Sequence, residues 1–324
     1  MKSSNVKNVF RALKEKYEAI DELKSLTGLI VLFLGAAVFT PKFYNPHNIS
    51  LLLGQMSVIA MAAIGEAFVI IMGSIDLSVG SIIGLSNVLT AILISQYNYD
   101  PRAALFAAMT IGGFIGFLNG ILVTKGKIPS FIATLATLTA VRGIAYLISG
   151  GLNIPVYNEA FLSLNEVLFG VPIIFWIYLT ALVILSIFFE LTRLGVYIRA
   201  IGSNELAVRN LGVDNSGMKN LAFTMSGVCS AIAGFMLGVR LGAGYPHSGI
   251  GYELDVIAAV VIGGVSLTGG TGSLIGTFIG ALLLAALLNI MVLAGIGAFM
   301  QYVVRGIVLI LAALAMRKMV AFVK

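Results

Sequence analysis

The chain has 324 residues, of which 59% are hydrophobic and only 10% are charged, and its formal net charge is +6. Because soluble domains carry about 25% charged residues, this composition excludes a water-soluble globular protein and predicts a protein embedded in lipid. The positive charges lie at the ends of apolar segments and not on one face, so no nucleic-acid partner is expected. Cys229 is the single cysteine, which excludes an intrachain disulfide and a thiolate metal site.

The segment 1–24 carries charges of both signs, unlike the short basic region that opens a signal peptide. The first apolar run also lacks a small-residue cleavage site, so we expect an uncleaved anchor. Apolar residues at helical spacing predict an amphipathic cytoplasmic lead-in helix on the membrane surface, and a frayed polar tail is the alternative. These residues are Phe10, Leu13, Tyr17 and Ile20.

Apolar runs of about 17 to 25 residues, the length that crosses a bilayer, recur along the chain. They lie near 25–40, 49–72, 77–95, 103–123, 129–149, 172–190, 218–241, 254–267, 274–293 and 297–316. The run at 254–267 is short and ends in glycines, which indicates a half-helix or a re-entrant segment. The predicted fold class is an all-α polytopic membrane protein with about ten transmembrane helices, and eight to eleven are admissible.

The distribution of lysine and arginine predicts the orientation, because cytoplasmic loops carry an excess of both. Most of them precede the first span, follow the fourth and sixth spans, or lie in the tail. Both termini are therefore expected in the cytoplasm. The predicted organisation is a lead-in at 1–24, a single transmembrane domain at 25–318 with a cytoplasmic loop at about 190–219, and a cytoplasmic tail at 319–324.

Two stretches repeat one phrase, Gly-Ser-Ile-Asp-Leu-Ser-Val-Gly at 73–80 and Gly-Gly-Val-Ser-Leu-Thr-Gly-Gly at 263–270. A further pair of near-copies follows them at 80–84 and 272–276. Such breaks free backbone groups that find no water in hydrocarbon. Matched breaks in two halves of a membrane chain point to a substrate path. The pattern predicts a transporter subunit with an internal repeat, parallel in the topology above.

The loop at 190–219 contains a short predicted helix that begins at the N-cap Asn204 and ends before Gly212. Such a mixed apolar and charged helix outside the membrane suits docking of another subunit, and a solvated connector is the alternative. The residues that this helix is expected to display are Leu206, Val208 and Leu211 beside Glu205 and Arg209. On the opposite side, the segment 150–171 is expected to cap a pore or to meet an extracellular partner.

Charged side chains inside predicted spans cost about 2.5–3.5 kcal/mol on insertion scales. For Glu66 and Arg142 this cost predicts a pairing or pathway role, with a structural salt bridge as the alternative. Asp76 lies beside Ser78 in the first break, where it either lines a gate or caps the next helix.

Glycines at four-residue spacing predict close helix packing, within one subunit in preference to a seam between two copies. The ladders are Gly112, Gly116 and Gly120; Gly272, Gly276 and Gly280; and the shorter pair Gly80 and Gly84.

Five stretches between about residues 45 and 315 resemble, in the same order, the permease subunits of ribose-type importers driven by ATP-binding cassette (ABC) ATPases. They are Met72–Gly80, Asn119-Gly120, Ile128–Thr134 with Arg142-Gly143, Ala200–Asn204 and Glu253–Leu267. The chain departs from the family pattern at Ser74, Ser130, Ala136 and Asn289-Ile-Met.

This resemblance implies a subunit of a bacterial inner-membrane importer. Its partners would be a cytoplasmic ABC ATPase, an extracytoplasmic sugar-binding protein, membrane lipid and a second permease copy, either identical or a paralogue. The chain has no phosphate-binding loop motif, so ATP and Mg²⁺ are expected in the partner, with no cofactor and no enzymatic site in this chain.

Two sets of functional residues are expected, the first implied by the resemblance and the second by the charged and polar residues of the predicted spans and breaks. The expected coupling helix at 200–213 would contact the ATPase through Gly202, Ser203, Asn204, Glu205, Arg209 and Gly212. The expected translocation path comprises Glu66, Asp76, Ser78, Asn119, Thr134, Arg142, Ser266 and Gln301. For the uncharged polar residues Asn119, Thr134 and Gln301, hydrogen bonds between helices are the alternative to contact with a sugar.

A stand-alone secondary transporter or facilitator is the second hypothesis, and it would need a relay of intramembrane carboxylates such as Glu66 and Asp76. A membrane-embedded enzyme is a distant third. His47 and His247 fall in loops without a metal-ligand neighbour at useful spacing.

Overall fold

Long apolar helices make up most of the molecule, for which the computed structural model describes residues 27–30, 32–33, 35 and 40–322. The amphipathic lead-in predicted for residues 1–24 lies outside the described residues, and the first predicted span is described only in part. The helices are α3 (Pro46–Ile71), α4 (Val79–Ser95), α5 (Pro101–Thr124), α6 (Ser130–Ser149), α7 (Glu159–Leu162), α8 (Ile173–Leu191), α9 (Arg193–Ser203), α10 (Glu205–Asn210), α11 (Asn215–Leu241), α12 (Tyr252–Ile262), α13 (Leu274–Leu293) and α14 (Ala298–Phe322).

Short elements connect these helices. Two single turns of 3₁₀ helix occur at Pro41–Tyr44 and Ser163–Asn165. Two antiparallel strand pairs, of two residues per strand, lie in the connections. They are β1 (Ile154–Pro155) with β4 (Ala243–Gly244), and β2 (Val167–Leu168) with β3 (Val171–Pro172).

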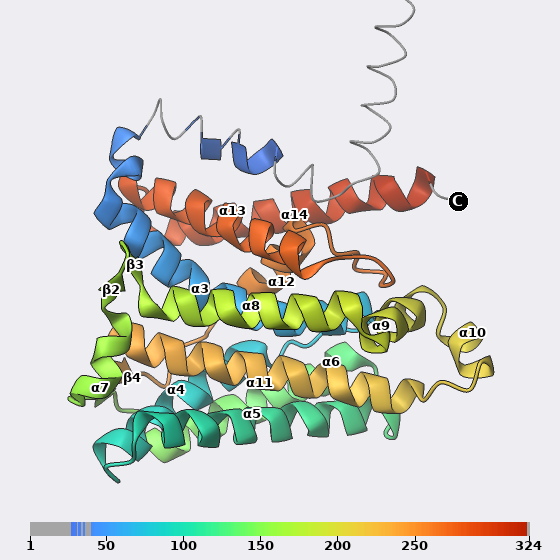
Figure 1. The fold of residues 1–324 in the computed structure, drawn as a ribbon, viewed down its shortest axis with the longest axis horizontal. Coiled ribbons are helices and arrows are strands. Elements are labelled where there is room, and N and C mark those ends of the chain that lie inside the picture. The colour runs from blue at the N-terminus through green and yellow to red at the C-terminus, as the bar shows by residue number, and fades with distance from the viewer. Residues whose placement is uncertain (1–26, 31, 34, 36–39, 323–324) are drawn as a thin grey trace, which may run out of the picture.

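The long helices lie roughly side by side, with α9 and α10 beyond one end of the bundle and α7, β2 and β3 at the opposite end (Figure 1). We call these the α10 end and the α7 end. Six described helices are long and apolar enough to cross a membrane: α3, α5, α6, α8, α11 and α13. Shorter apolar helices are α4 and residues 298–311. The polytopic all-helical class is therefore confirmed, while the total of about ten spans stays a prediction.

Helix α12 has only 11 residues. At 1.5 Å per residue it is about 16 Å long, roughly half of the hydrocarbon thickness of a bilayer. A short helix therefore lies in the run at 254–267, and the choice between a half-helix and a re-entrant segment stays a prediction.

The core is centred on α3, which packs against α8, α11, α12 and α13. A helix that is apolar on every side is stable only when every side is covered, and α3 is almost completely buried from Met56 to Ile71. Small residues permit this contact. A Cβ added to Gly65 would lie 2.7 Å from the Ser226 Cα of α11, so α3 and α11 approach backbone to backbone.

The predicted glycine ladders pack within this one chain. A Cβ at Gly112 or Gly116 would lie 2.5 Å from the Gly227 carbonyl oxygen or 2.1 Å from that of Phe223, both on α11. Gly280 on α13 meets the Ala259 carbonyl of α12 in the same way, at 2.1 Å. Close packing within the subunit is thus confirmed for these ladders.

The outward faces of several helices are apolar. Phe106 of α5, Leu147 of α6 and Phe299 of α14 are 72%, 81% and 88% exposed. In a protein built from membrane-spanning helices, such faces contact lipid or another subunit.

Candidate functional site

The first break, residues 72–78 between α3 and α4, is enclosed by side chains from four helices. Four consecutive backbone N–H groups there have side-chain acceptors. Ile75 donates to the Ser130 hydroxyl (3.2 Å), Asp76 to the Glu66 carboxylate (3.0 Å), Leu77 to the Thr134 hydroxyl (3.0 Å) and Ser78 to the Asp76 carboxylate (2.9 Å). These bonds explain how a non-helical segment is stable inside the helix bundle, since every backbone donor that is not bonded within a helix must find an internal partner.

Asp76 is the centre of this network. Its Oδ1 also accepts from the Ser78 hydroxyl (2.5 Å), and its Oδ2 accepts from the Ser226 hydroxyl of α11 (2.9 Å). The expectation that Asp76 occupies the N-cap position of the next helix is wrong, because Ser78 is the N-cap of α4. Asp76 lies two residues earlier and binds the Ser78 N–H in a local turn, which is a common alternative for aspartate.

Asn119 of α5 extends the network. Its Nδ2 donates to the Ser78 hydroxyl (2.9 Å), and its Oδ1 accepts from the Thr137 hydroxyl of α6 (2.6 Å). The hydrogen bonds between helices foreseen as an alternative are present for Asn119, whereas Thr134 bonds to the backbone of the first break. Five expected path residues, Glu66, Asp76, Ser78, Asn119 and Thr134, are brought together here, and all five are fully buried. They face one another in this conformation.

The other three expected path residues lie apart. The Arg142 guanidinium donates to the Ser248 and Gly249 carbonyl oxygens at 2.5 and 3.1 Å. The Ser266 hydroxyl pairs with that of Thr268 (2.8 Å) inside the second break. Gln301 donates to the Ile296 carbonyl (3.1 Å) at the start of α14.

The two repeated phrases touch each other at the α10 end. A Cβ on Gly269 would lie 2.9 Å from the Gly73 Cα, and the Gly270 N–H donates to the Ile71 carbonyl (2.7 Å). Both breaks follow the carboxyl end of a helix, α3 or α12. These two helices therefore run toward the same end of the bundle, as a parallel repeat requires.

Gly202, in the last turn of α9, packs against both breaks. A Cβ there would lie 1.9 Å from the Ile71 carbonyl oxygen and 2.5 Å from the Gly270 nitrogen. The neighbouring Ser203 lies 2.4 Å from the equivalent Cβ position on Gly270. Only glycine fits at position 202 without moving these backbones, so α9 is in direct contact with the end of α3 and with the second break.

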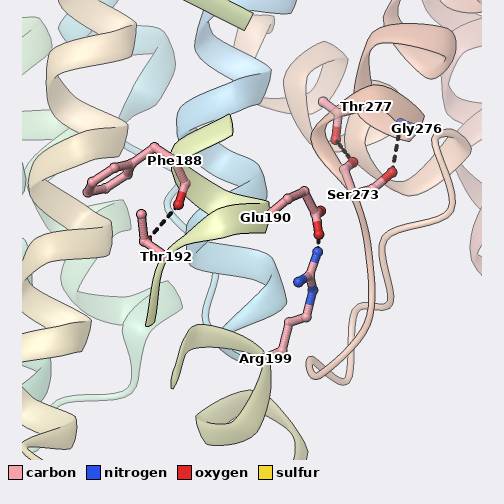
Figure 2. Close-up of polar contacts among 7 residues, drawn as sticks. All are labelled: Phe188, Glu190, Thr192, Arg199, Ser273, Gly276 and Thr277. Atoms are coloured by element: carbon pink, nitrogen blue, oxygen red, sulfur yellow. Dashed lines mark hydrogen bonds and ion pairs between the residues drawn. The ribbon is translucent and has the colours of Figure 1, made fainter. Parts of the chain in front are cut away.

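Helix α9 is attached to α8 through a short elbow (Figure 2). Glu190 and Arg199 form an ion pair across it, and the Arg199 guanidinium lies 4.3 Å from the centre of the Phe189 ring. Thr192 donates its hydroxyl proton to the Phe188 carbonyl (2.6 Å). In the same view, Ser273 caps α13 by accepting from the Gly276 N–H (2.9 Å). These contacts make the elbow a defined angle and not a free hinge.

The short helix predicted at the α10 end is confirmed. Asn204 is its N-cap and accepts from the Ala207 N–H (3.0 Å), and Gly212 follows the helix with φ of +81°. The expectation that Val208 is displayed is wrong, because it is only 6% exposed and belongs to the main hydrophobic core. Leu206 and Leu211 are displayed, at 72% and 82% exposed.

A polar cavity of about 570 Å³ opens beside α10. The first break and α10 both border it, and three basic side chains contribute to its wall. The charged and polar lining residues are Ser74, Thr124, Lys127, Ser130, Glu205, Arg209, Ser216 and Lys219. Lys219 pairs with Glu205 (2.7 Å). Within the part of the chain that the structure describes, no group of three or more histidine, cysteine or acidic residues could hold a metal ion.

Sequence reasoning missed several partners in these sites. Asn87 of α4 is fully buried and holds the 242–251 loop, although a lone amide in an apolar run was the signal already used for Asn119. Arg305 of α14 pairs with the 3% exposed Asp255 of α12 (2.8 Å). Ser130 was noted only as a departure from the family pattern, yet its hydroxyl binds the first break.

Comparison with known proteins gives a consistent result over nearly the whole chain. Residues 48–313 match the family model described as branched-chain amino acid transport system / permease component. The chain is 38% identical over 308 residues to the ribose import permease protein RbsC of Escherichia coli K12, covering 92% of this chain and 94% of that protein.

Two further relatives agree. The chain is 40% identical over 302 residues to RbsC of Bacillus subtilis 168, covering 92% of this chain and 94% of the relative. It is 39% identical over 295 residues to the L-arabinose transport system permease protein AraH of E. coli K12, covering 91% and 90%. No solved structure matches the chain.

Proposed function

Because this chain belongs to the branched-chain amino acid transport system / permease component family, we propose that it forms the translocation path of an ABC importer for a monosaccharide. The chain is a multi-pass permease subunit of the bacterial inner membrane. The three relatives described above are named for ribose or L-arabinose. Both are uncharged pentoses, so a pentose is the cargo to test first.

The observation that carries this proposal is the contact of α9 with both repeated breaks. Gly202 lies against Ile71 and Gly270, and the Gly270 N–H is bonded to the Ile71 carbonyl. A force applied to α9 and α10 from outside the membrane therefore reaches the end of α3 and the second break through direct backbone contacts. This arrangement suits a permease whose energy comes from another subunit.

The α10 end is the cytoplasmic end in this proposal, and both termini lie on the same side, with about ten spans between them. Leu206 and Leu211 are large apolar side chains exposed on a helix outside the bundle, which is the character of a docking surface. They would dock the ATPase, with Gly202, Ser203, Asn204, Glu205, Arg209 and Gly212 forming the coupling element. ATP and Mg²⁺ would bind that partner, so hydrolysis takes place outside this chain.

Three further partners belong to the proposed assembly. A second permease copy, identical or a paralogue, and lipid would cover the apolar outward faces of the bundle. The sugar-binding protein would deliver cargo at the α7 end, onto the connections that contain α7 and the short strand pairs.

The polar network at the first break would serve the path when the subunit changes conformation. Ser78, Asn119 and Thr134 carry hydroxyl and amide groups, which are the partners that an uncharged sugar needs. In the described conformation Asn119 donates to the Ser78 hydroxyl, and the Thr134 hydroxyl accepts from the Leu77 N–H. Opening of the break would exchange those bonds for bonds to the sugar, with Glu66, Asp76, Arg142, Ser266 and Gln301 bordering the same route.

The alternative, a facilitator or secondary transporter that works alone, is favoured by one observation. Glu66 and Asp76 are both buried, and Glu66 Oε2 has no hydrogen-bond partner. Such a pair of intramembrane carboxylates would suit an ion-driven carrier.

Purification of the tagged chain from its native membrane, with identification of the proteins that accompany it, separates the two proposals. An ABC ATPase in stoichiometric amount is expected, together with one or two kinds of permease chain, which would distinguish a homodimeric from a heterodimeric pore. A chain that purifies alone and equilibrates sugar across liposomes without ATP would support the facilitator.

A further inference from the structure

The connection between α11 and α12, residues 242–251, is held against the bundle by an amide side chain of α4. Asn87 Nδ2 donates to the Ala243 carbonyl (3.2 Å), and Asn87 Oδ1 accepts from the Tyr245 N–H (2.7 Å). The Asn87 side chain is fully buried. Both polar functions of one amide thus bind the amino-terminal part of this connection, which we call the α11–α12 loop.

Arg142 of α6 binds the other part of the α11–α12 loop. Its guanidinium donates to two consecutive carbonyl groups, those of Ser248 and Gly249. Gly249 has φ of +76°, and a Cβ there would lie 2.2 Å from the Gly80 carbonyl oxygen at the start of α4. The loop therefore rests directly on the helix that follows the first break, with the arginine holding it in place.

Glu253, in the first turn of α12, is unsatisfied in this arrangement. One oxygen accepts from the Gly251 N–H at 3.3 Å, whereas Oε2 is buried and has no hydrogen-bond partner. Its charge attracts the Arg142 guanidinium, but the two do not form an ion pair within the described part of the chain. A buried carboxylate oxygen without a donor is costly, so this arrangement leaves a strong acceptor unused beside a strong donor.

We propose that Arg142 is a positioning residue that latches the α11–α12 loop shut, and that it exchanges the Ser248 and Gly249 carbonyls for the Glu253 carboxylate when the loop opens. This inference rests on the proposed function, under which opening of the α11–α12 loop would admit cargo from the α7 end.

The chemistry of the three groups suits such an exchange. A guanidinium has five donors in a fixed plane and binds either two carbonyl oxygens or one carboxylate. When the latch is closed, Arg142 is satisfied and Glu253 Oε2 is not. When it is open, Glu253 gains its partner and the two loop carbonyls become free to bind water or cargo. Each state thus leaves a different group unsatisfied, as expected for an element with two discrete arrangements.

The exposure of the loop can be measured by cysteine labelling from the outside. Cys229 is buried and is first replaced by alanine, and Ser248→Cys then serves as the only reporter. In native membranes, Arg142→Met is expected to raise the labelling rate by a membrane-impermeant maleimide at least tenfold, because two charge-assisted hydrogen bonds are lost. The labelling rate of Arg142→Lys should lie between those of the parent and Arg142→Met, because an ammonium group cannot bind both carbonyl oxygens as well as a guanidinium can.

Arg102→Met is the matched control, because Arg102 is an exposed arginine in the first turn of α5 whose side chain makes no hydrogen bond or ion pair to the loop within the described residues. It should label at the parent rate. Labelling of both Arg142 variants at the parent rate would overturn the latch. If Arg142→Met does not accumulate in the membrane, the same judgement is made from Arg142→Lys.

The exchange itself is tested with Glu253→Gln, which keeps the size of the side chain and removes its charge. Resting labelling should match the parent, because the latch is intact. The increase in labelling on addition of binding protein and ATP should disappear, and sugar uptake should fall at least tenfold. Normal uptake with a normal labelling increase would overturn the exchange. If neither the parent nor any variant shows ATP-linked uptake, the proposed function is wrong. The labelling rates of the parent and the Arg142 variants without ATP would still show whether Arg142 holds the loop closed.

Discussion

Replacement of Gly202 by alanine is predicted to uncouple ATP hydrolysis from transport while leaving the subunit folded. The added Cβ would lie 1.9 Å from the Ile71 carbonyl oxygen, whereas real Cβ contacts are at least 3.0 Å, so the backbones must separate by about 1.1 Å. The Gly270 nitrogen lies 2.5 Å from the same position, and its hydrogen bond to Ile71 is therefore stretched.

Two opposing terms set the size of the effect on stability. Overpacking costs about 1–3 kcal/mol, and alanine is favoured over glycine in a helix by about 1 kcal/mol. The net destabilisation of up to about 2 kcal/mol is within what a folded chain tolerates. If the same 1–2 kcal/mol is lost from the coupled state, the number of sugars moved per ATP hydrolysed falls about 5–30-fold.

The assay compares sugar accumulation with phosphate release in proteoliposomes that contain the complete complex. Gly143→Ala is the matched control, since Gly143 is also helical but has nothing within 4 Å of an added Cβ. That variant should keep the parent ratio. A parent ratio in Gly202→Ala, with normal assembly and thermal stability, would show that α9 does not act through this contact.

Three further predictions follow from the described contacts. The Asp76 carboxylate accepts three hydrogen bonds, and Asp76→Asn replaces one of its two oxygens with an NH₂ donor. The free energy of unfolding, measured by thermal denaturation in detergent, should therefore fall by about 2–3 kcal/mol. Arg305→Met leaves the 3% exposed Asp255 without its partner and should cost about 3–5 kcal/mol, much of which the added change Asp255→Leu should restore. Leu206→Ser combined with Leu211→Ser should reduce the amount of ATPase that purifies with the chain, without lowering the melting temperature of the chain alone.

Each of these has a result that contradicts it. An Asp76→Asn chain as stable as the parent would mean that the network at the first break does not support the fold. If the double Arg305→Met and Asp255→Leu variant is no more stable than Arg305→Met alone, the loss of stability does not come from the unpaired carboxylate. Full retention of the ATPase by the double leucine variant would move the docking surface away from α10.

Local features of the sequence were sufficient to predict the breaks and the helix ends. Glycines and small polar residues interrupt an apolar run at 73–80, and the helix does stop and restart there. Asn204 and Gly212 bound α10 because capping depends on one or two neighbouring residues. The shortness of α12 was predictable for the same reason, since it follows from the short apolar run that ends in glycines.

Partners distant in the chain were not predictable in the same way. Asn87 binds Tyr245 across 158 residues, and Thr134 accepts from Leu77 across 57. Nothing in the composition of either segment specifies the other, because the pairing follows from the packing of α4, α6 and α11. Val208 shows the converse error. We expected Val208 to be exposed together with Leu206, but Val208 packs into the main hydrophobic core.

The decisive measurement is sugar uptake by liposomes that contain the purified chain, alone or together with its co-purified ATPase and binding protein. The chain alone should take up no labelled ribose or arabinose. With the partners and ATP present, the sugar should accumulate above its outside concentration. Uptake by the chain alone, unaffected by ATP or by the partners, would contradict the assignment of this protein as an ATP-driven permease subunit.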